Sequence, residues 1–303
     1  MKKIIYGLGL ASLCMILIAC SKEDDPQPSG IYDNAFAVPD DATDETSILC
    51  RNFHERTGIY LLFNDTLSRQ LIGKDPYGKD IWKVETVDFN YNLTSDAGET
   101  YRFSYIEKLD GMRSVIDFLE NRIIPHLGDG ILRPYSILPF GKIETYSRRK
   151  WKEIDFANCM RCLGLNMRTI VEGASEEELD DYANTLLKAI VSARFNYSSD
   201  EAEAFLEISD KYYWEIISDH IDWDRDYPED VYNLGFMDYT PDFWEDAPAY
   251  DEFIGPDDDF NMFFSAVMEM DEDEFLDQWG EYPVIVQKYR LMKNIIIGLG
   301  YEF

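Results

Sequence analysis

The hydrophobic and polar positions of the N-terminal half follow the periods of two strands and one helix. Residues 58–63 form a continuous apolar, β-prone run, which predicts a central strand. Apolar and polar residues alternate over 82–91, the period of a strand with one face in water. Residues 110–126 repeat at helical spacing, and Pro125 and Gly128 mark the end of this helix.

Weaker patterns lie between these elements. Residues 47–55 predict a short helix, and the turn-rich residues 73–79 predict a loop. A strand is expected over residues 135–146, and Pro139 places it near a sheet edge because proline cannot donate a ladder hydrogen bond. Residues 160–167 predict a further short strand.

The C-terminal half changes to helical periodicity. Ser175 and Glu178 form a capping box, a signature of a helix start. Apolar residues then recur along one helical face: Leu179, Tyr182, Ala183, Leu186, Leu187, Ile190 and Val191. Further helices are predicted over residues 200–209, 259–270, 271–279 and 282–298. The last of these has Ile285, Tyr289, Met292 and Ile296 on one face and Gly298 as its C-cap.

These elements predict an α+β fold, a small mixed β-sheet with a helix followed by a mostly helical half. We expect one domain over residues 46–303, with a sheet subdomain at 46–170 and a helical subdomain at 171–303. The acidic, aromatic and proline-interrupted residues 219–255 predict a long ordered loop within the helical subdomain.

The first residues have the three parts of a secretory signal peptide. Lys2 and Lys3 are followed by the apolar residues 4–18, a run shorter than the about 20 residues of a membrane span. The end of this run, residues 17–20, reads Leu-Ile-Ala-Cys and resembles a lipobox, in which the cysteine is diacylated after cleavage before it. The sequence therefore predicts a signal peptide over residues 1–19 and lipidation of Cys20, which would anchor the protein to a membrane.

A polar tether follows the lipidated cysteine. Residues 21–25, Ser-Lys-Glu-Asp-Asp, resemble the surface-export signal of Bacteroidota lipoproteins, and residues 26–30 continue as a flexible linker. We therefore assign residues 20–45 to an acidic tether. The expected location is the outer membrane, with the protein exposed at the cell surface.

The composition excludes some partners. The formal net charge of −31 repels nucleic acid and anionic lipid, so neither is an expected partner beyond the lipid anchor itself. The chain is rich in aromatic residues, with 20 Tyr, 18 Phe and 6 Trp, which favour core positions over a sugar-binding platform.

Three cysteines remain after Cys14 leaves with the leader and Cys20 carries lipid. Cys159 and Cys162 have the spacing of a redox or metal-binding pair. No second cysteine pair and no nearby histidine completes a tetrahedral site. Buried thiols or a small local disulfide are the preferred interpretation, and the third cysteine, Cys50, excludes a fully paired framework.

The order of elements resembles the zinc-binding metallopeptidase lipoproteins of Bacteroidota, the substrate-import-associated zinc metallohydrolase family. The similar phrases span most of the chain after the tether: residues 53–63, 110–126, 135–143, 208–213, 234–239, 258–260, 282–288 and 299–301. The resemblance implies a zincin-like fold and a place beside TonB-dependent transporters and their receptor lipoproteins.

The motif that defines this family, His-Glu-x-x-His, is absent. Two imidazoles at i and i+4 share one helical face for zinc, and the glutamate acts as general base. The corresponding positions hold Lys188, Ala189 and Ser192. The three histidines, His54, His126 and His220, form no such pair anywhere in the chain, so neither a catalytic residue nor a zinc ligand is expected.

Acidic clusters offer only weak metal sites. Asp259, beside Asp258, falls where the resemblance places an acidic third metal ligand, but without imidazole partners we interpret these aspartates as a helix N-terminal cap. Asp222, Asp224 and Asp226 alternate as at the start of a calcium loop. However, an EF-hand would have Gly at 227 and Glu at 233, where Tyr and Asn stand. Calcium is therefore only a weak alternative cofactor, and none is expected.

Three functions are consistent with these observations. The first is a catalytically inactive metallohydrolase-like surface lipoprotein associated with nutrient uptake, which would bind a glycan or peptide ligand. The second is an active metallopeptidase or glycosidase with a rebuilt carboxylate site, for which 59 acidic residues offer many pairs. The third is a structural or adhesive surface protein.

Overall fold

The computed structural model describes residues 34–89, 100–159, 161–221, 227–241 and 251–303. The chain divides into two units, Met1–Ala37 and Val38–Phe303. In the first, the described residues 34–37 form a turn in which the backbone N–H of Phe36 donates to Asn34 Oδ1 at 3.1 Å. The second contains all the helices and strands named below. The predicted signal peptide and Cys20 lie outside the described residues.

A mixed sheet of six strands forms the N-terminal half of the second unit, which confirms the predicted α+β class with a small mixed sheet. The strands are β1 (Tyr60–Leu61), β4 (Tyr101–Tyr105), β5 (Ser136–Ser147), β6 (Lys150–Glu153), β7 (Phe156–Asn158) and β8 (Leu163–Asn166). Their order is β1-β5-β8-β7, and β4 and β6 also pair with β5. Strand β5 runs parallel to β1 and β8 and antiparallel to β4 and β6.

The predicted position of residues 135–146 near a sheet edge is wrong, because β5 is the central strand. Pro139 pairs with Leu165 of β8 on one side. On the other side, β1 pairs only as far as Ile137, and β4 begins its pairing at Phe140. Pro139 therefore lies in the gap between β1 and β4. Neither strand places a carbonyl group opposite this position, so the N–H that proline lacks is not needed for a ladder hydrogen bond.

A strand forms within residues 58–63, as predicted, but its predicted central position is wrong. Only Tyr60 and Leu61 form a strand, and β1 lies at one end of the sheet order. The run is apolar because Ile59, Leu61 and Phe63 are buried in the core. The apolar sequence of residues 58–63 thus results from burial in the core and not from a strand that pairs with a neighbour on each side.

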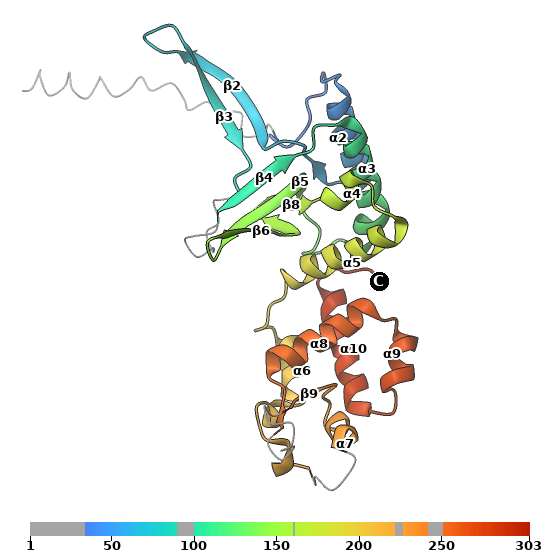
Figure 1. Ribbon diagram of the computed structural model, residues 1–303. Coiled ribbons are helices and arrows are strands. Elements are labelled where there is room, and N and C mark those ends of the chain that lie inside the picture. Colours follow the sequence, from blue (N-terminus) through green and yellow to red (C-terminus); the bar gives the residue numbers. More distant parts are fainter. Residues whose placement is uncertain (1–33, 90–99, 160, 222–226, 242–250) are drawn as a thin grey trace, which may run out of the picture. The chain divides into compact units, whose positions relative to one another are not determined.

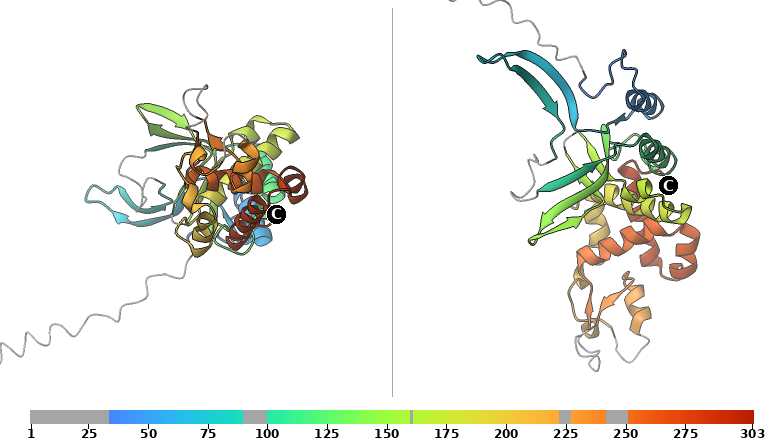
Figure 2. Two further views of the ribbon diagram at one scale, coloured as in Figure 1. Left: turned by 90° about the horizontal axis from the view of Figure 1, so that it is seen from below. Right: turned by 45° about the horizontal axis from the view of Figure 1, so that its top comes forward.

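A long hairpin separates β1 from the rest of the sheet. It joins β2 (Thr66–Lys74) to β3 (Asp80–Thr86) in a sheet of its own. The turn predicted at residues 73–79 is confirmed around Asp75, although β2 itself is missing from the prediction. The strand predicted over 82–91 is exposed on both faces rather than one, and residues 90–91 lie outside the described ranges. Figures 1 and 2 show the hairpin projecting away from the six-stranded sheet.

Helices cover one side of the sheet (Figure 1). The predicted helix over residues 47–55 is confirmed as α2 (Glu45–Thr57), which begins where the Asp44 side chain accepts from Ser47 N–H and ends at Gly58, with φ of 73°. The helix predicted over 110–126 is confirmed as α3 (Leu109–Phe118), continued by a π-helical turn (Leu119–Ile123) and a 3₁₀ turn (Ile124–His126). The short α4 (Arg168–Glu172) follows β8.

The C-terminal half is mostly helical, as predicted. Its helices are α5 (Glu176–Ser192), α6 (Asp200–Glu207), α7 (Tyr227–Asn233), α8 (Pro256–Glu269), α9 (Glu272–Trp279) and α10 (Pro283–Gly298). The capping box at the start of α5 forms as expected. The C-cap of α10 is Leu299 rather than Gly298, and Gly300 adopts the left-handed conformation at φ of 96°.

The loop predicted over residues 219–255 contains regular structure. Helix α7 lies within it, and β9 (Tyr239–Thr240) pairs antiparallel with β10 (Glu252–Phe253). A small core joins Ile217, Val231, Phe236, Phe253 and Ile254. Phe236 and Phe253 of this acidic segment are thus buried in a core of their own.

A larger core links the sheet to the helices. It includes Phe53 of α2, Ile137 of β5, Leu186 of α5 and Phe263 of α8. Within the described parts of residues 34–303, no helix combines the length and apolar character that a membrane crossing needs.

Candidate functional site

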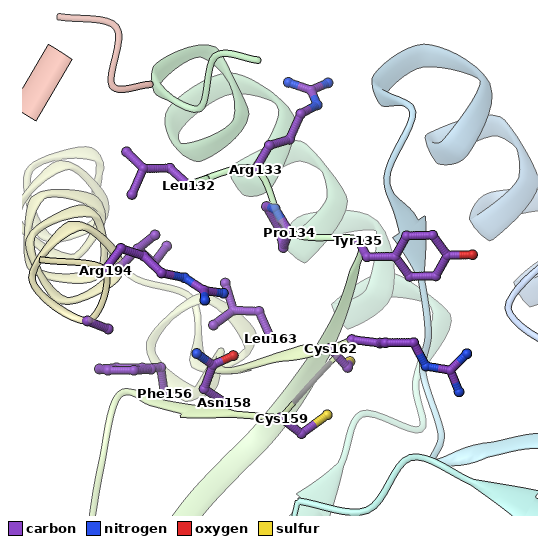
Figure 3. Close-up of a pocket in the computed structure, with 13 residues that line it drawn as sticks. Leu132, Arg133, Pro134, Tyr135, Phe156, Asn158, Cys159, Cys162, Leu163 and Arg194 are labelled. Atoms are coloured by element: carbon purple, nitrogen blue, oxygen red, sulfur yellow. The ribbon is translucent and has the colours of Figure 1, made fainter. Parts of the chain in front are cut away.

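A pocket of about 220 Å³ lies between the β7–β8 hairpin and the C-terminal end of α5 (Figure 3). Its lining comes from three segments: residues 132–135 before β5, residues 156–163 of the hairpin, and Ile190, Ala193 and Arg194 at the end of α5. Apolar side chains such as Leu132, Phe156 and Leu163 form part of its wall. The pocket therefore lies between one edge of the sheet and the end of a helix.

Cys159 and Cys162 lie on the hairpin side of this pocket (Figure 3). They follow the register of β7 with β8, in which Asn158 pairs with Leu163, and the N–H of Cys159 donates to the carbonyl of Cys162 at 3.0 Å. Both are free thiols. Cys162 is 3 % exposed and buried behind the hairpin, whereas Cys159 is half-buried at the pocket.

The two thiols differ in acidity as well as in exposure. A hydrogen bond from the Cys162 thiol, with help from backbone N–H groups and the charge of Arg161, lowers the pKa of Cys159 to about 6. Burial raises the pKa of Cys162 well above its usual value, and the neighbouring Cys159 raises it further. One thiol is thus prepared to ionise while the other stays protonated.

Three arginines and no carboxylate line the pocket: Arg133, Arg161 and Arg194. Arg133 is committed to structure, because its guanidinium donates to the backbone carbonyls of Leu127 and Thr57. Arg194 is exposed, and its side chain extends from the end of α5 toward the pocket (Figure 3). Arg161 forms an ion pair with Glu85 of β3 at 3.7 Å. The positive charge of the pocket therefore comes mainly from Arg133 and Arg194, in a chain with a net charge of −31.

The positions that the resemblance assigns to the zinc motif lie just before this pocket on α5. Lys188 forms an ion pair with Glu269 of α8. Ala189 is half-buried and Ser192 is exposed. These side chains tie α5 to α8 or face solvent, and none of them lines the pocket.

Asp259 is fully buried in a polar cluster rather than capping a helix, so the predicted capping role is wrong. The N-cap of α8 is Gly255, Pro256 follows it, and Asp258 is exposed in the first turn. Asp259 Oδ2 lies 2.5 Å from Lys288 Nζ and accepts a hydrogen bond from the Tyr213 hydroxyl at 2.6 Å. The reason for the difference is tertiary: α10 brings a buried cation to this carboxylate.

Lys288 is fully buried beside Asp259. Its ammonium group also donates to Ser209 Oγ at 3.2 Å and to the carbonyl of Gly235 at 3.0 Å. The rings of Phe205, Phe236 and Phe263 surround it at 4.8–5.0 Å from the ammonium nitrogen. Burial raises the pKa of Asp259 and lowers the pKa of Lys288, and their mutual attraction opposes both shifts.

The residues present do not fit the zinc ion of the family that the sequence resembles. A zinc site needs three or four nitrogen, sulfur or carboxylate donors around one point. The position of the third ligand is taken by Asp259, whose Oδ2 is already bound to the Lys288 ammonium. Among the described residues, no three His, Cys, Asp or Glu side chains are grouped so that they could hold a metal ion.

The histidines lie on separate elements and serve local packing. His54 of α2 stacks on Tyr60 with ring centroids 4.0 Å apart. His126 Nδ1 lies 2.8 Å from the carbonyl oxygen of Glu302, and His220 meets the ring of Tyr212 edge-on. Cys50 is buried, and burial raises its pKa to about 12. Asp222, Asp224 and Asp226, the weak calcium pattern, lie outside the described residues.

Sequence reasoning found the cysteine pair but not its surroundings. It missed Arg194, which follows the last turn of α5 and carries no motif. It also missed Lys288, although its position between Ile285 and Met292 on the apolar face of α10 is a signal that could have been read.

Comparisons with known proteins add no relative. No family model matches the chain, and no curated protein and no solved structure is significantly similar to it.

Proposed function

We propose that this protein is a lipid-anchored protein on the outer face of the outer membrane, a zincin-like and catalytically silent relative of zinc metallohydrolases. In this proposal it supports TonB-dependent nutrient uptake by holding partner proteins or a glycan or peptide ligand. The support for a zincin-like fold is the order of elements, a small mixed sheet followed by the long capped helix α5 and further helices.

The buried pair of Asp259 and Lys288 is the observation that carries the silent role. Asp259 Oδ2 is bound to an ammonium group that is itself 0 % exposed, and Oδ1 is buried without a hydrogen-bond partner. Among the described residues, no further His, Cys, Asp or Glu side chains group with this carboxylate to complete a metal site. Removing this cation would leave the Asp259 carboxylate as a buried charge without a counter-charge, which costs about 3–5 kcal/mol. The chemistry that the resemblance places at this point is thus replaced by a structural contact.

The second hypothesis, a hydrolase with a rebuilt carboxylate site, requires carboxylates that converge on a cleft. The pocket beside Cys159 is lined by arginines and apolar residues instead. The region around Lys188 is occupied by the ion pair with Glu269. These observations favour the silent role over rebuilt catalysis.

The β2–β3 hairpin supports a role in holding partners. It exposes several large apolar side chains: Leu71, Ile72, Tyr77, Ile81, Trp82 and Val84. Tyr77 at the turn is 95 % exposed. Water-exposed apolar side chains on a projecting strand pair are typical of a surface that is covered in a complex.

Metal analysis tests the silent role. We expect the purified full-length chain to contain no stoichiometric zinc and to hydrolyse peptides no faster in zinc than in chelator. One tightly bound zinc per chain, together with hydrolysis that a chelator abolishes, would overturn the proposal.

Localisation tests the anchor separately. Cells producing the wild-type chain should incorporate labelled fatty acid into it and expose it to added protease, whereas the Cys20→Ala variant should remain unlabelled. Failure of the wild type to take up label contradicts the anchor.

Cross-linking in intact cells tests the partner-binding surface. Leu71→Ser with Ile72→Ser should lose cross-links to membrane proteins. Lys74→Ser, on the same hairpin, is the matched control and should keep them. Equal cross-linking in both variants contradicts a role for the apolar hairpin.

A further inference from the structure

We propose that Cys159 and Cys162 form a redox-active dithiol that exchanges with small, carboxylate-bearing disulfides entering the adjacent pocket. The inference goes beyond the proposed function and does not rest on it, because it depends only on two sulfur atoms and the groups around them.

The backbone already places the two cysteines at the separation of a disulfide. They are directly opposite each other at the end of the β7–β8 ladder, joined by the hydrogen bond from Cys159 N–H to the Cys162 carbonyl. Cα atoms of such a hydrogen-bonded pair lie about 5.5 Å apart, within the about 4.4–6.8 Å that disulfides span. Oxidation therefore closes a small local ring without unfolding the sheet.

The exposure of the two thiols assigns them different roles. Cys159 lines the pocket and is half-buried, so an incoming disulfide can reach its sulfur. Cys162 is buried behind it and meets the Cys159 sulfur in a hydrogen bond. Cys159 is thus the attacking thiol and Cys162 the resolving thiol. The lowered pKa of Cys159 supplies the thiolate that attack requires.

The charge of the pocket selects the substrate class. Arg133 and Arg194 line a pocket that has no acidic residue, in a chain whose net charge is −31. Arg161 also lines the pocket but forms an ion pair with Glu85 of β3 at 3.7 Å. Arg194 extends toward the pocket from the side opposite the hairpin (Figure 3). A disulfide that carries carboxylates is attracted to these guanidinium groups, whereas the net charge of the molecule as a whole repels it.

The Cys159 thiolate attacks one sulfur of the substrate R–S–S–R, forms a Cys159–S–S–R bond and releases one R–S⁻. Cys162 loses its proton to solvent, attacks the Cys159 sulfur and forms the Cys159–Cys162 disulfide, which releases the second R–S⁻. The dithiol loses two electrons and the substrate disulfide gains them, and the reverse reaction oxidises two small thiols.

Three small disulfides of similar length probe this site: dithiodipropionate with two carboxylates, bis(hydroxyethyl) disulfide without charge, and cystamine with two amines. Peptide mass spectrometry of the full-length chain locates each adduct, so that Cys14, Cys20 and Cys50 are counted separately. We expect dithiodipropionate to oxidise the wild type to a Cys159–Cys162 disulfide with release of two thiols per disulfide consumed. Cys162→Ser should stop at an adduct on Cys159, and Cys159→Ser should form no adduct at this site.

Charge selectivity is tested with arginine variants. Arg194→Gln should slow the reaction with dithiodipropionate by about threefold to tenfold and leave bis(hydroxyethyl) disulfide unchanged. Arg148→Gln, at an exposed turn between β5 and β6, is the matched control and should react like the wild type. Equal rates for dithiodipropionate and cystamine in the wild type contradict the assigned substrate class.

A measurement on the wild type covers the case in which a cysteine variant fails to fold. Iodoacetamide should modify Cys159 with a midpoint near pH 6, the pKa of this thiol being about 6. At pH 5, a thiol of this pKa is about 300 times more ionised than an ordinary cysteine of pKa about 8.5. Lower basicity reduces the reactivity of the thiolate by about 15-fold, which leaves about a 20-fold advantage over the same cysteine in the urea-unfolded chain. No advantage at pH 5 would overturn the redox assignment.

Discussion

Replacing Lys288 by methionine tests whether the buried ion pair holds the helical half together. Methionine has a similar length and fills the aromatic cage of Phe205, Phe236 and Phe263. The substitution removes the only cation that contacts the Asp259 carboxylate among the described residues. Asp259 would then be a buried charge held by one hydrogen bond from Tyr213.

The magnitude follows from the burial of both groups. Both side chains are 0 % exposed, so water cannot replace the missing ammonium. Removing one partner of a buried ion pair costs about 3–5 kcal/mol. In a domain of this size that loss corresponds to a fall in melting temperature of roughly 10 °C.

The loss should depend on pH in a defined direction. Burial already raises the pKa of Asp259, and Lys288 is the main influence that lowers it, so the variant should have a still higher pKa at Asp259. A carboxyl group with a raised folded-state pKa stabilises the fold at low pH and loses that stability as pH rises through the folded pKa. The deficit of Lys288→Met relative to the wild type should therefore be greatest at pH 7 and shrink as pH falls toward 5.

Urea unfolding at pH 7 and pH 5 measures both effects, with the double variant Asp259→Asn and Lys288→Met as control. The amide is uncharged and still accepts the Tyr213 hydrogen bond, so the double variant should regain at least about 2 kcal/mol and lose the pH dependence. If the single and double variants are equally unstable at both pH values, the charge argument is refuted and only packing remains.

Three further substitutions test local claims. Ser175→Ala removes the hydroxyl that accepts from Glu178 N–H and should cost about 1 kcal/mol in urea unfolding. Gly235→Ala should destabilise by about 2 kcal/mol in the same assay. Its φ is 92° and an added Cβ would lie 2.5 Å from Val284 Cγ1, so an unchanged midpoint would contradict this backbone conformation. Arg133→Ala leaves the carbonyls of Leu127 and Thr57 without their guanidinium donor and should lower the free energy of unfolding by about 2 kcal/mol, whereas Arg148→Ala should change it little.

Elements defined by neighbouring residues could be predicted from the sequence. The cap of α5 depends on Ser175 and Glu178, three residues apart, and it forms as expected. The helices of the C-terminal half follow their apolar spacing to within a few residues. Helix formation is local, so its signals stand close together in the chain.

Strand positions depend on partners far away in the sequence, and here prediction failed. Pro139 would indicate an edge strand only if one continuous strand had to pair along the whole of that side of β5, including the position opposite the proline. The structure instead leaves the proline between β1 and β4, whose residues are more than 30 positions away. Strand β7 is only three residues long, and its sequence, Phe-Ala-Asn, does not alternate apolar and polar residues. Without it, Cys159 and Cys162 could not be placed opposite each other.

The buried cluster at Asp259 shows what could have been inferred from the sequence. The apolar face of α10 was recognised from Ile285, Tyr289, Met292 and Ile296, and residue 288 lies on that same face, three positions after the first and four before the third. A lysine within an apolar face must find a counter-charge, because burying it alone costs more than the fold can supply. Asp259 directly precedes Phe260, which begins the apolar face of α8 together with Phe263. The sequence of α10 therefore predicts that Lys288 pairs with a buried acidic side chain, and Asp259 fulfils this requirement from α8.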